Sequence, residues 1–313
     1  MKEKIMHFAN FNITFGEEGE PLLSHFADFV FPALLSNCIR REIEEYPQFF
    51  FRDVKIKRYK DEYILVGNYI KNTMYDVRTV FANHELIGAP STIPTAPYSR
   101  FIVRLKNHRM ILVRNESASP DIRSFQKTLR YVLSSYVSAY NKKHRPAKIP
   151  SVDINIVDMM TKDEITSIIN NMDKITELRL RFFKLNGDTD PSSTIQAIRE
   201  LANSVGSKTS HAVLNSPKSK PGVQKVLEET ALSGTAETTL EGLDSSGHKR
   251  KIKSNSFTAS TKIGMGRDIE ASDDEYLLDA ALNNESMRNI SAENQRNYNE
   301  ALENIFRLSE RGI

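Results

Sequence analysis

Apolar and polar residues alternate along the first third of the chain, and this alternation predicts strands. Over residues 6–15 the side chains of Ala9, Phe11, Ile13 and Phe15 fall on one face, as in a strand with one buried side. Two later pairs of such stretches flank short polar turns and predict hairpins. These hairpins cover 53–70 and 98–114, and Gly88 with three prolines predicts a loop over 83–97 between them.

A recurrence of apolar residues every three or four positions predicts a long helix over 120–143. Ser119 is placed to cap its first turn, and Pro120 suits the first helical position. Lys142 and Lys143 lie at its C-terminal end, where cations interact favourably with the helix dipole. The pattern therefore predicts an amphipathic helix with one face in a core.

The rest of the pattern predicts further strands and helices, followed by a more polar C-terminal part. Thr161-Lys-Asp-Glu164 has the spacing of a capping box, and the Ser-, Lys-, Gly- and Pro-rich stretch 206–221 predicts a linker. We expect an α+β protein, with a mainly antiparallel sheet and packed helices over 1–205 and a hairpin-and-helix region over 206–313. The other predicted elements are a helical stretch over 21–46 interrupted by Pro32, strands over 152–157 and 175–183, helices over 161–172 and 222–230, a helix from Asp190-Pro191 to 205, a hairpin over 235–263 and acidic helices after 268.

Composition narrows the class of protein. The 313 residues are 39% hydrophobic and 27% charged, which excludes collagen-like and fully disordered chains. The longest apolar run, 26–35, has about half of the ~20 residues that a membrane-spanning helix needs, and no apolar stretch of signal-peptide length follows Met1. A single cysteine, Cys38, excludes an internal disulfide. We therefore expect a cytoplasmic protein.

The formal net charge of +3 hides a strong asymmetry. Residues 1–150 hold 23 basic and 15 acidic side chains, a net charge of +8, whereas 151–313 hold 20 and 25, a net charge of −5. Between 100 and 148 there are 12 basic residues and two acidic ones, and 268–313 hold 11 acidic and four basic ones. A folded segment this basic attracts polyanions such as nucleic acid. Docking onto the chain's own acidic end is the alternative interpretation.

Three basic arrays are candidates for contacts with phosphates, which require only Lys and Arg side chains at suitable spacing. The absence of tryptophan argues against a stacking platform for single strands, so duplex DNA held through its backbone is the favoured ligand. The hairpin array is Arg100, Arg104, Lys106, Arg109 and Arg114; the helix stripe is Arg123, Lys127, Arg130, Lys142, Lys143 and Arg145; the late-hairpin array is Lys249, Arg250, Lys251 and Lys253.

No constellation of residues defines an enzyme. The chain lacks a phosphate-binding glycine loop, a dinucleotide fingerprint and a Gly-x-Ser-x-Gly elbow, and its seven histidines are not spaced to share a metal. Asp53-Val-Lys-Ile-Lys57 loosely resembles a strand of metal-dependent nucleases, but an exposed strand explains it better. Arg104-Leu-Lys-Asn-His108 has the wrong spacing for an arginine–histidine ribonuclease pair. We therefore predict no catalytic residue, no metal ligand and no cofactor.

The order of elements over about 50–185 resembles that of the RexA phage-exclusion proteins and the related RdgC recombination-associated proteins. Tyr98-Ser-Arg-Phe-Ile-Val and Met110-Ile-Leu-Val carry this resemblance, which extends to uncharacterised bacterial families found near mobile elements and antiphage genes. The resemblance implies a dimeric α+β protein that binds duplex DNA without sequence specificity and acts in phage defence. It covers less than half of the chain and transfers no functional residue.

Three functions are compatible with these patterns. The leading hypothesis is a non-enzymatic, oligomeric DNA-binding protein of a bacterial phage-defence or mobile-element system. The second is a protein-interaction or scaffold subunit of a defence complex, in which the basic patch receives an acidic partner or the chain's own end. The third is an unrecognised metal-dependent nuclease toxin. The first hypothesis requires the basic side chains to converge on one open surface.

Overall fold

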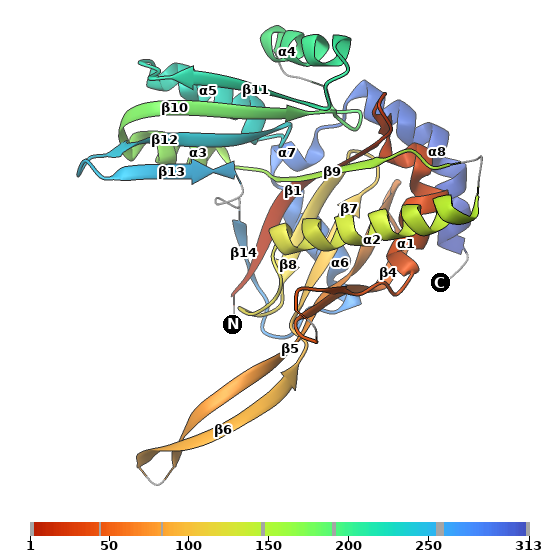
Figure 1. The fold of residues 1–313 in the computed structure, drawn as a ribbon, viewed down its shortest axis with the longest axis vertical. Helices are drawn as coiled ribbons and strands as arrows, with labels where there is room; N and C mark the ends of the chain where they lie inside the picture. Colours follow the sequence, from red (N-terminus) through yellow and green to blue (C-terminus); the bar gives the residue numbers. More distant parts are fainter. Residues whose placement is uncertain are drawn as a thin grey trace.

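The computed structural model describes residues 3–43, 45–82, 84–144, 148–189, 192–254 and 260–310. They form two antiparallel sheets with helices packed on both. The predicted α+β fold class, with mainly antiparallel sheets, is therefore confirmed. Figure 1 shows the two sheets side by side and a two-stranded arm that projects from the first of them.

The first sheet combines strands from the N-terminal half of the chain with one late strand. Its strands are β1 (Glu3–Phe15), β2 (Glu20–Pro21), β3 (Arg40–Arg41), β4 (Gln48–Tyr59), β5 (Glu62–Ala82), β6 (Glu85–Thr95), β7 (Tyr98–Arg104), β8 (Arg109–Arg114), β9 (Val152–Asp158) and β14 (Ser260–Gly264). Strand β1 pairs with β8 along one edge and with β14 and β9 along the other. The order then continues from β8 through β7, β5 and β4 to β3, so the two predicted hairpins lie next to each other.

Helix α2 (Ile122–Lys143) packs across one face of this sheet. The ring of its Phe125 lies 5.1–5.3 Å from the rings of Phe51, Tyr69 and Phe101, each in an edge-to-face arrangement. Such arrangements match the positive edge of one ring to the negative face of the next. The apolar face of the predicted helix is therefore buried, and its polar face is left on the outside of the molecule.

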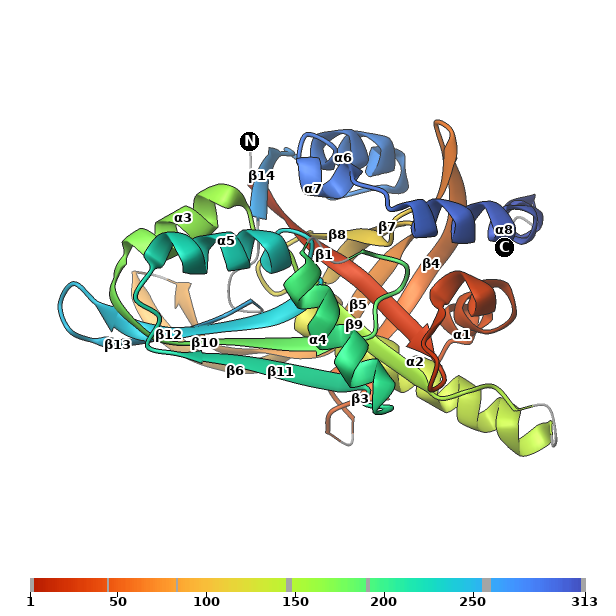
Figure 2. The same cartoon turned by 90° about the horizontal axis from the view of Figure 1, so that it is seen from above.

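The second sheet has the order β11-β10-β12-β13. Its strands are β10 (Met172–Phe183), β11 (Thr209–Asn215), β12 (Ala236–Asp244) and β13 (Lys249–Lys253), and its helices are α3 (Lys162–Asn170), α4 (Ser193–Ser204) and α5 (Lys220–Ala231). Helices α3 and α5 cover one face with a core that includes Ile165 and Leu227. Figure 2 shows both helices on the same side of the strands, and α2 on the opposite side of the molecule. The other face of the second sheet is open, and it faces the viewer together with α2 in Figure 1.

The C-terminal segment returns to the first sheet. It contains η4 (Ala271–Asp273), α6 (Asp274–Ala281), α7 (Glu285–Arg288) and α8 (Ala292–Glu310). Leu277 and Met287 are buried on the sheet face opposite α2, while Tyr298 and Ile305 join the main core. The expected boundary at residue 205 does not follow this arrangement, because β10 belongs to the second sheet and β14 pairs with β1.

Several predicted element bounds change. Within the stretch predicted as a loop, Glu85–Thr95 form strand β6, because proline is tolerated in an edge strand. The 206–221 linker contains β11, which pairs with β10. The cap of α2 is Asp121, whose carboxylate accepts a hydrogen bond from the Ser124 N–H, whereas the Ser119 hydroxyl accepts one from Glu116. The predicted capping box at Thr161 is present.

The helical stretch expected over 21–46 is shorter than predicted. It consists of η1 (Leu22–His25), η2 (Phe26–Val30) and α1 (Phe31–Leu35), and β3 follows it. The expected helix start at Asp190-Pro191 lies outside the described residues, and α4 is capped by Ser192. In the part of the chain that the structure describes, no helix is both long and apolar enough to cross a membrane.

Candidate nucleic-acid interface

The arginines of the hairpin array are mostly buried in ion pairs. Arg100 is 2% exposed and donates two hydrogen bonds of 2.7 Å to the carboxylate of Asp274. Arg104 is 7% exposed and donates to both carboxylate oxygens of Glu62, at 2.6 and 3.0 Å. A third guanidinium N–H donates to the side-chain oxygen of Asn68 in Arg100 and to the backbone carbonyl oxygen of Met287 in Arg104. The interpretation of these two side chains as surface contacts is therefore wrong.

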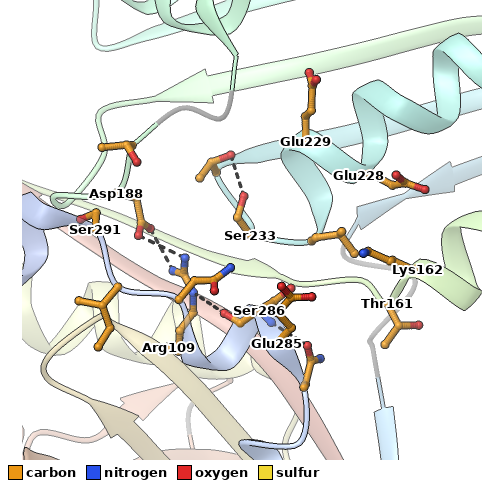
Figure 3. Close-up of a pocket in the computed structure, with 16 residues that line it drawn as sticks. Arg109, Thr161, Lys162, Asp188, Glu228, Glu229, Ser233, Glu285, Ser286 and Ser291 are labelled. Atoms are coloured by element: carbon orange, nitrogen blue, oxygen red, sulfur yellow. Dashed lines mark hydrogen bonds and ion pairs between the residues drawn. The ribbon is translucent and has the colours of Figure 1, made fainter.

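Arg109 is also buried in an ion pair, with a different carboxylate. It is 3% exposed and donates to Asp188 at 3.0 and 3.2 Å, as Figure 3 shows. Asp188 also accepts hydrogen bonds from Asn10 and Asn294, so it joins three distant parts of the chain. Arg109 is therefore not a surface contact either. Both faces of β8 are covered, so its successive side chains point into one buried layer or the other instead of into solvent.

Arg109 and Asp188 form part of the wall of a pocket of about 500 Å³ between α3, α5 and α7 (Figure 3). The charged side chains that line this pocket are two cations and four carboxylates. They are Arg109, Lys162, Asp188, Glu228, Glu229 and Glu285. The excess of carboxylates makes this pocket unfavourable for a phosphate.

The last two members of the hairpin array also serve the fold. Arg114 donates to the backbone carbonyl oxygens of Ser117 and Ser119. It thereby holds the link that leads into α2. Lys106 lies 3.4 Å from the carboxylate of Asp61, across the turn of the neighbouring hairpin. The hairpin array as a whole is thus a structural network, and it does not form an open surface.

The helix stripe, in contrast, is open. Arg123, Lys127 and Arg130 are exposed on α2, and among the described residues none of them forms an ion pair. The Arg130 guanidinium donates to the backbone carbonyl oxygen of Ile154 at 2.8 Å, which fixes its direction toward β9. Lys142 and Lys143 are exposed at the other end of the helix, where they border a hollow of about 540 Å³. Arg145 lies outside the described residues.

A groove of about 240 Å³ joins the helix stripe to the second sheet, and we call it the basic groove. Four cations and one carboxylate line it, together with neutral residues. Arg130 comes from α2, Arg181 from β10, and Lys184 and Lys208 from the segments that flank α4; the carboxylate is that of Asp153 on β9. Lys208 lies 3.5 Å from Asp153, and Arg181 lies 3.1 Å from Glu237. Both pairs are exposed enough for solvent and salt to weaken them.

The late-hairpin array continues this surface on the open face of the second sheet. Lys249, Lys251 and Lys253 alternate along β13, so they share a face. Lys251 pairs with Glu241, and among the described residues Lys249 and Lys253 form no ion pair. Arg250 lies on the alternate face and donates to Asp244 at 2.8 Å, so it is separated from the three lysines.

The open side of the molecule therefore carries cations from α2, β10, β13 and the segments that flank α4, and we call this side the basic face. The carboxylates of Asp153, Glu177, Glu237 and Glu241 lie among these cations and pair with four of them. Sequence reasoning missed Lys184 and Lys208, because they are isolated from the charge clusters along the chain. The available signal was the alternation of Arg179 and Arg181 with buried apolar residues on β10, which marks an exposed basic strand face. The basic face comprises Arg123, Lys127, Arg130, Arg179, Arg181, Lys184, Lys208, Lys249, Lys251 and Lys253.

A buried carboxylate lies beside one end of the helix stripe. Burial raises the pKa of Asp158 to about 7; the nearby Asp121 raises it further, and Arg123 opposes the shift. One oxygen of this carboxylate, Oδ1, has no hydrogen-bond partner among the described residues. An acid whose pKa is higher in the folded state stabilises the fold below its unfolded pKa. That stabilisation is lost as the pH rises through the folded pKa.

Replacing Asp158 by Asn is expected to remove this pH dependence. The difference in unfolding free energy between Asp158→Asn and the parent protein should shift in favour of the variant by about 2 kcal/mol between pH 5.5 and 7.5. Urea titrations at both pH values measure it. Comparing the two proteins cancels the contributions of His7 and His108, whose pKa values burial lowers to about 4. An unchanged difference would contradict the expected shift.

Comparison of the chain with protein-family models and with curated proteins finds no match.

Proposed function

We propose that the basic face binds the phosphate backbone of duplex nucleic acid, with DNA as the favoured form and without sequence specificity. The observation that carries this proposal is the convergence of cations from three separate parts of the chain on the basic groove. Backbone binding needs positive side chains on an open surface and no particular motif. The helix stripe adds length to this surface, because α2 has 22 residues and spans ~33 Å, about one turn of a duplex.

A duplex suits this surface better than a single strand. Single-strand binding without sequence preference uses aromatic side chains on which bases stack. The open face of the second sheet holds charged, hydroxyl and aliphatic side chains, such as Arg179, Thr239 and Val213, and one imidazole, that of His211. Phe183, which has the same parity on β10, is buried. The sheet thus offers charge and hydrogen bonds with a single aromatic ring, that of His211, rather than a row of rings on which successive bases could stack.

The proposed biological setting is phage defence or the control of mobile elements. It depends on the resemblance in element order to the RexA and RdgC proteins, and the basic face gives it a physical basis. The buried arginines of the hairpin array play no part in this proposal.

Salt dependence tests the proposal directly. Fluorescence anisotropy with a labelled duplex of 24 base pairs should show binding at 50 mM salt. If about six phosphates are contacted, affinity should fall roughly a thousandfold between 50 and 200 mM salt. The matching single strand should bind more weakly. Binding that does not respond to salt, or no binding at 50 mM, would refute the proposal. Adding Mg²⁺ to the same samples distinguishes binding from cleavage, since a nuclease would shorten the duplex.

A further inference from the structure

The arm formed by β5 and β6 is the most exposed apolar part of the molecule. Residues 73–82 of β5 pair only with β6 in the described part of the chain, and the arm extends away from both sheets (Figure 1). An isolated two-stranded ribbon is at best marginally stable in water. Four large apolar side chains nevertheless lie on one of its faces, since Tyr75 is opposite Ile93 and Phe81 is opposite Leu86. The exposed fraction is 64% for Tyr75, 51% for Ile93, 70% for Phe81 and 76% for Leu86.

The two edges of the arm differ in their capacity to pair with another strand. The outer edge of β6 contains Pro90 and Pro94, which have no N–H to donate. The outer edge of β5 over 73–82 contains no proline and is rich in β-branched and aromatic residues. This edge continues the side of β5 that pairs with β4, and the β4 pairing stops at Asn72. One unpaired edge with good strand-forming residues is therefore available.

The sequence of this edge is complementary to itself. In an antiparallel pair of two copies centred on Val77, Asp76 of one copy is opposite Arg78 of the other, and this ion pair occurs twice. The same register places Tyr75 opposite Thr79 and Phe81 opposite Thr73, which are favourable aromatic and β-branched pairs. A register centred on position 76 would place two aspartates opposite each other, and one centred on 78 would do the same with two arginines. Among the two-fold registers of this edge, only the one centred on Val77 places Asp76 opposite Arg78.

We infer that the arm pairs with the arm of a second copy of this chain, β5 against β5 and antiparallel about Val77. The two ribbons then form one four-stranded sheet with a two-fold axis. Such an interface is isologous, because the same surface is used on both copies. The second copy supplies the strand neighbours that an isolated ribbon lacks, and three or more strands give a sheet independent stability.

Cysteine cross-linking tests the register. In a background in which the native Cys38 is replaced by Ser, Val77→Cys should give a covalent dimer under mild oxidation, because directly opposite Cα atoms lie ~4.5–5.5 Å apart. Thr73→Cys is the matched control: its two copies would be eight residues apart along the ribbon, ~26 Å, and should not cross-link. Equal cross-linking at both positions, or none at position 77, would overturn the register.

Exchanging the charges at positions 76 and 78 tests whether a second copy of the chain pairs with the arm. Sedimentation of the parent protein should show a dimer, and Asp76→Arg or Arg78→Asp alone should shift it to monomer by placing like charges opposite each other twice. The double variant Asp76→Arg/Arg78→Asp should restore the dimer. A parent protein that stays monomeric at all concentrations would overturn the inference. So would a dimer that the single variants leave intact. Circular dichroism checks that the sheets of each variant remain folded. Because sedimentation is measured without nucleic acid, its result does not depend on nucleic-acid binding.

Discussion

Replacing Arg130, Arg181 and Lys208 together by Glu is expected to lower the affinity for a DNA duplex by about a thousandfold at 100 mM salt. Each lost phosphate contact reduces affinity roughly tenfold at this salt concentration, and it lowers the slope of log affinity against log salt by about one. Arg130 comes from α2, Arg181 from β10, and Lys208 immediately precedes β11. All three line the basic groove. Fluorescence anisotropy over a salt series measures both quantities.

The matched control places the same charge change on the opposite side of the molecule. Arg288, Arg296 and Arg307 are exposed on α7 and α8, which lie at the side of the molecule away from α2 in Figure 2. Replacing all three by Glu changes the net charge by the same amount. If the basic groove is the contact surface, the control should keep most of its affinity and its full salt slope. Equal losses in both variants would show that net charge alone drives association, and the groove assignment would fail.

The local sequence determined most elements of the fold. Alternation identified β1 and both central hairpins, and the capping box at Thr161 marked the start of α3 correctly. The failures have a common physical cause, which is pairing with distant strands. Strand β11 lies in a stretch whose composition is typical of a linker, and it is extended because β10 offers a ladder. Such a partner cannot be read from the residues of the strand itself.

Only part of the candidate site could be predicted, because contacts with distant parts of the chain again decide which side chains are exposed. Charge density along the chain pointed to the helix stripe, whose described cations lie on the outer face of α2. It failed for Arg100, because the strand position alone does not reveal that Asp274, 174 residues later, lies against it. Local charge excess alone does not distinguish an external anion from a carboxylate of the same chain. In this hairpin, however, the anions are the protein's own carboxylates.

The buried pair of Arg100 and Asp274 gives the second large expected effect. Replacing Asp274 by Ala should lower the unfolding free energy by about 3–5 kcal/mol, because it leaves the Arg100 guanidinium buried without its carboxylate. Lys57, which lies 2.6 Å from the same carboxylate, is partly exposed and can turn to solvent. Urea denaturation of the parent and the variant at pH 7 measures the difference.

Two further variants separate this pair from a general effect of charge. Glu303→Ala removes an exposed pair with Arg307 on α8, and it should cause no measurable change, because water already screens that pair. Replacing both partners, as Arg100→Met with Asp274→Leu, should recover most of the stability lost in Asp274→Ala, since no uncompensated charge then remains buried. If Asp274→Ala proved as mild as Glu303→Ala, the arginine would have to reach solvent or another anion. Arg100 would then again be a candidate for phosphate binding, in conflict with its position between the first sheet and α6.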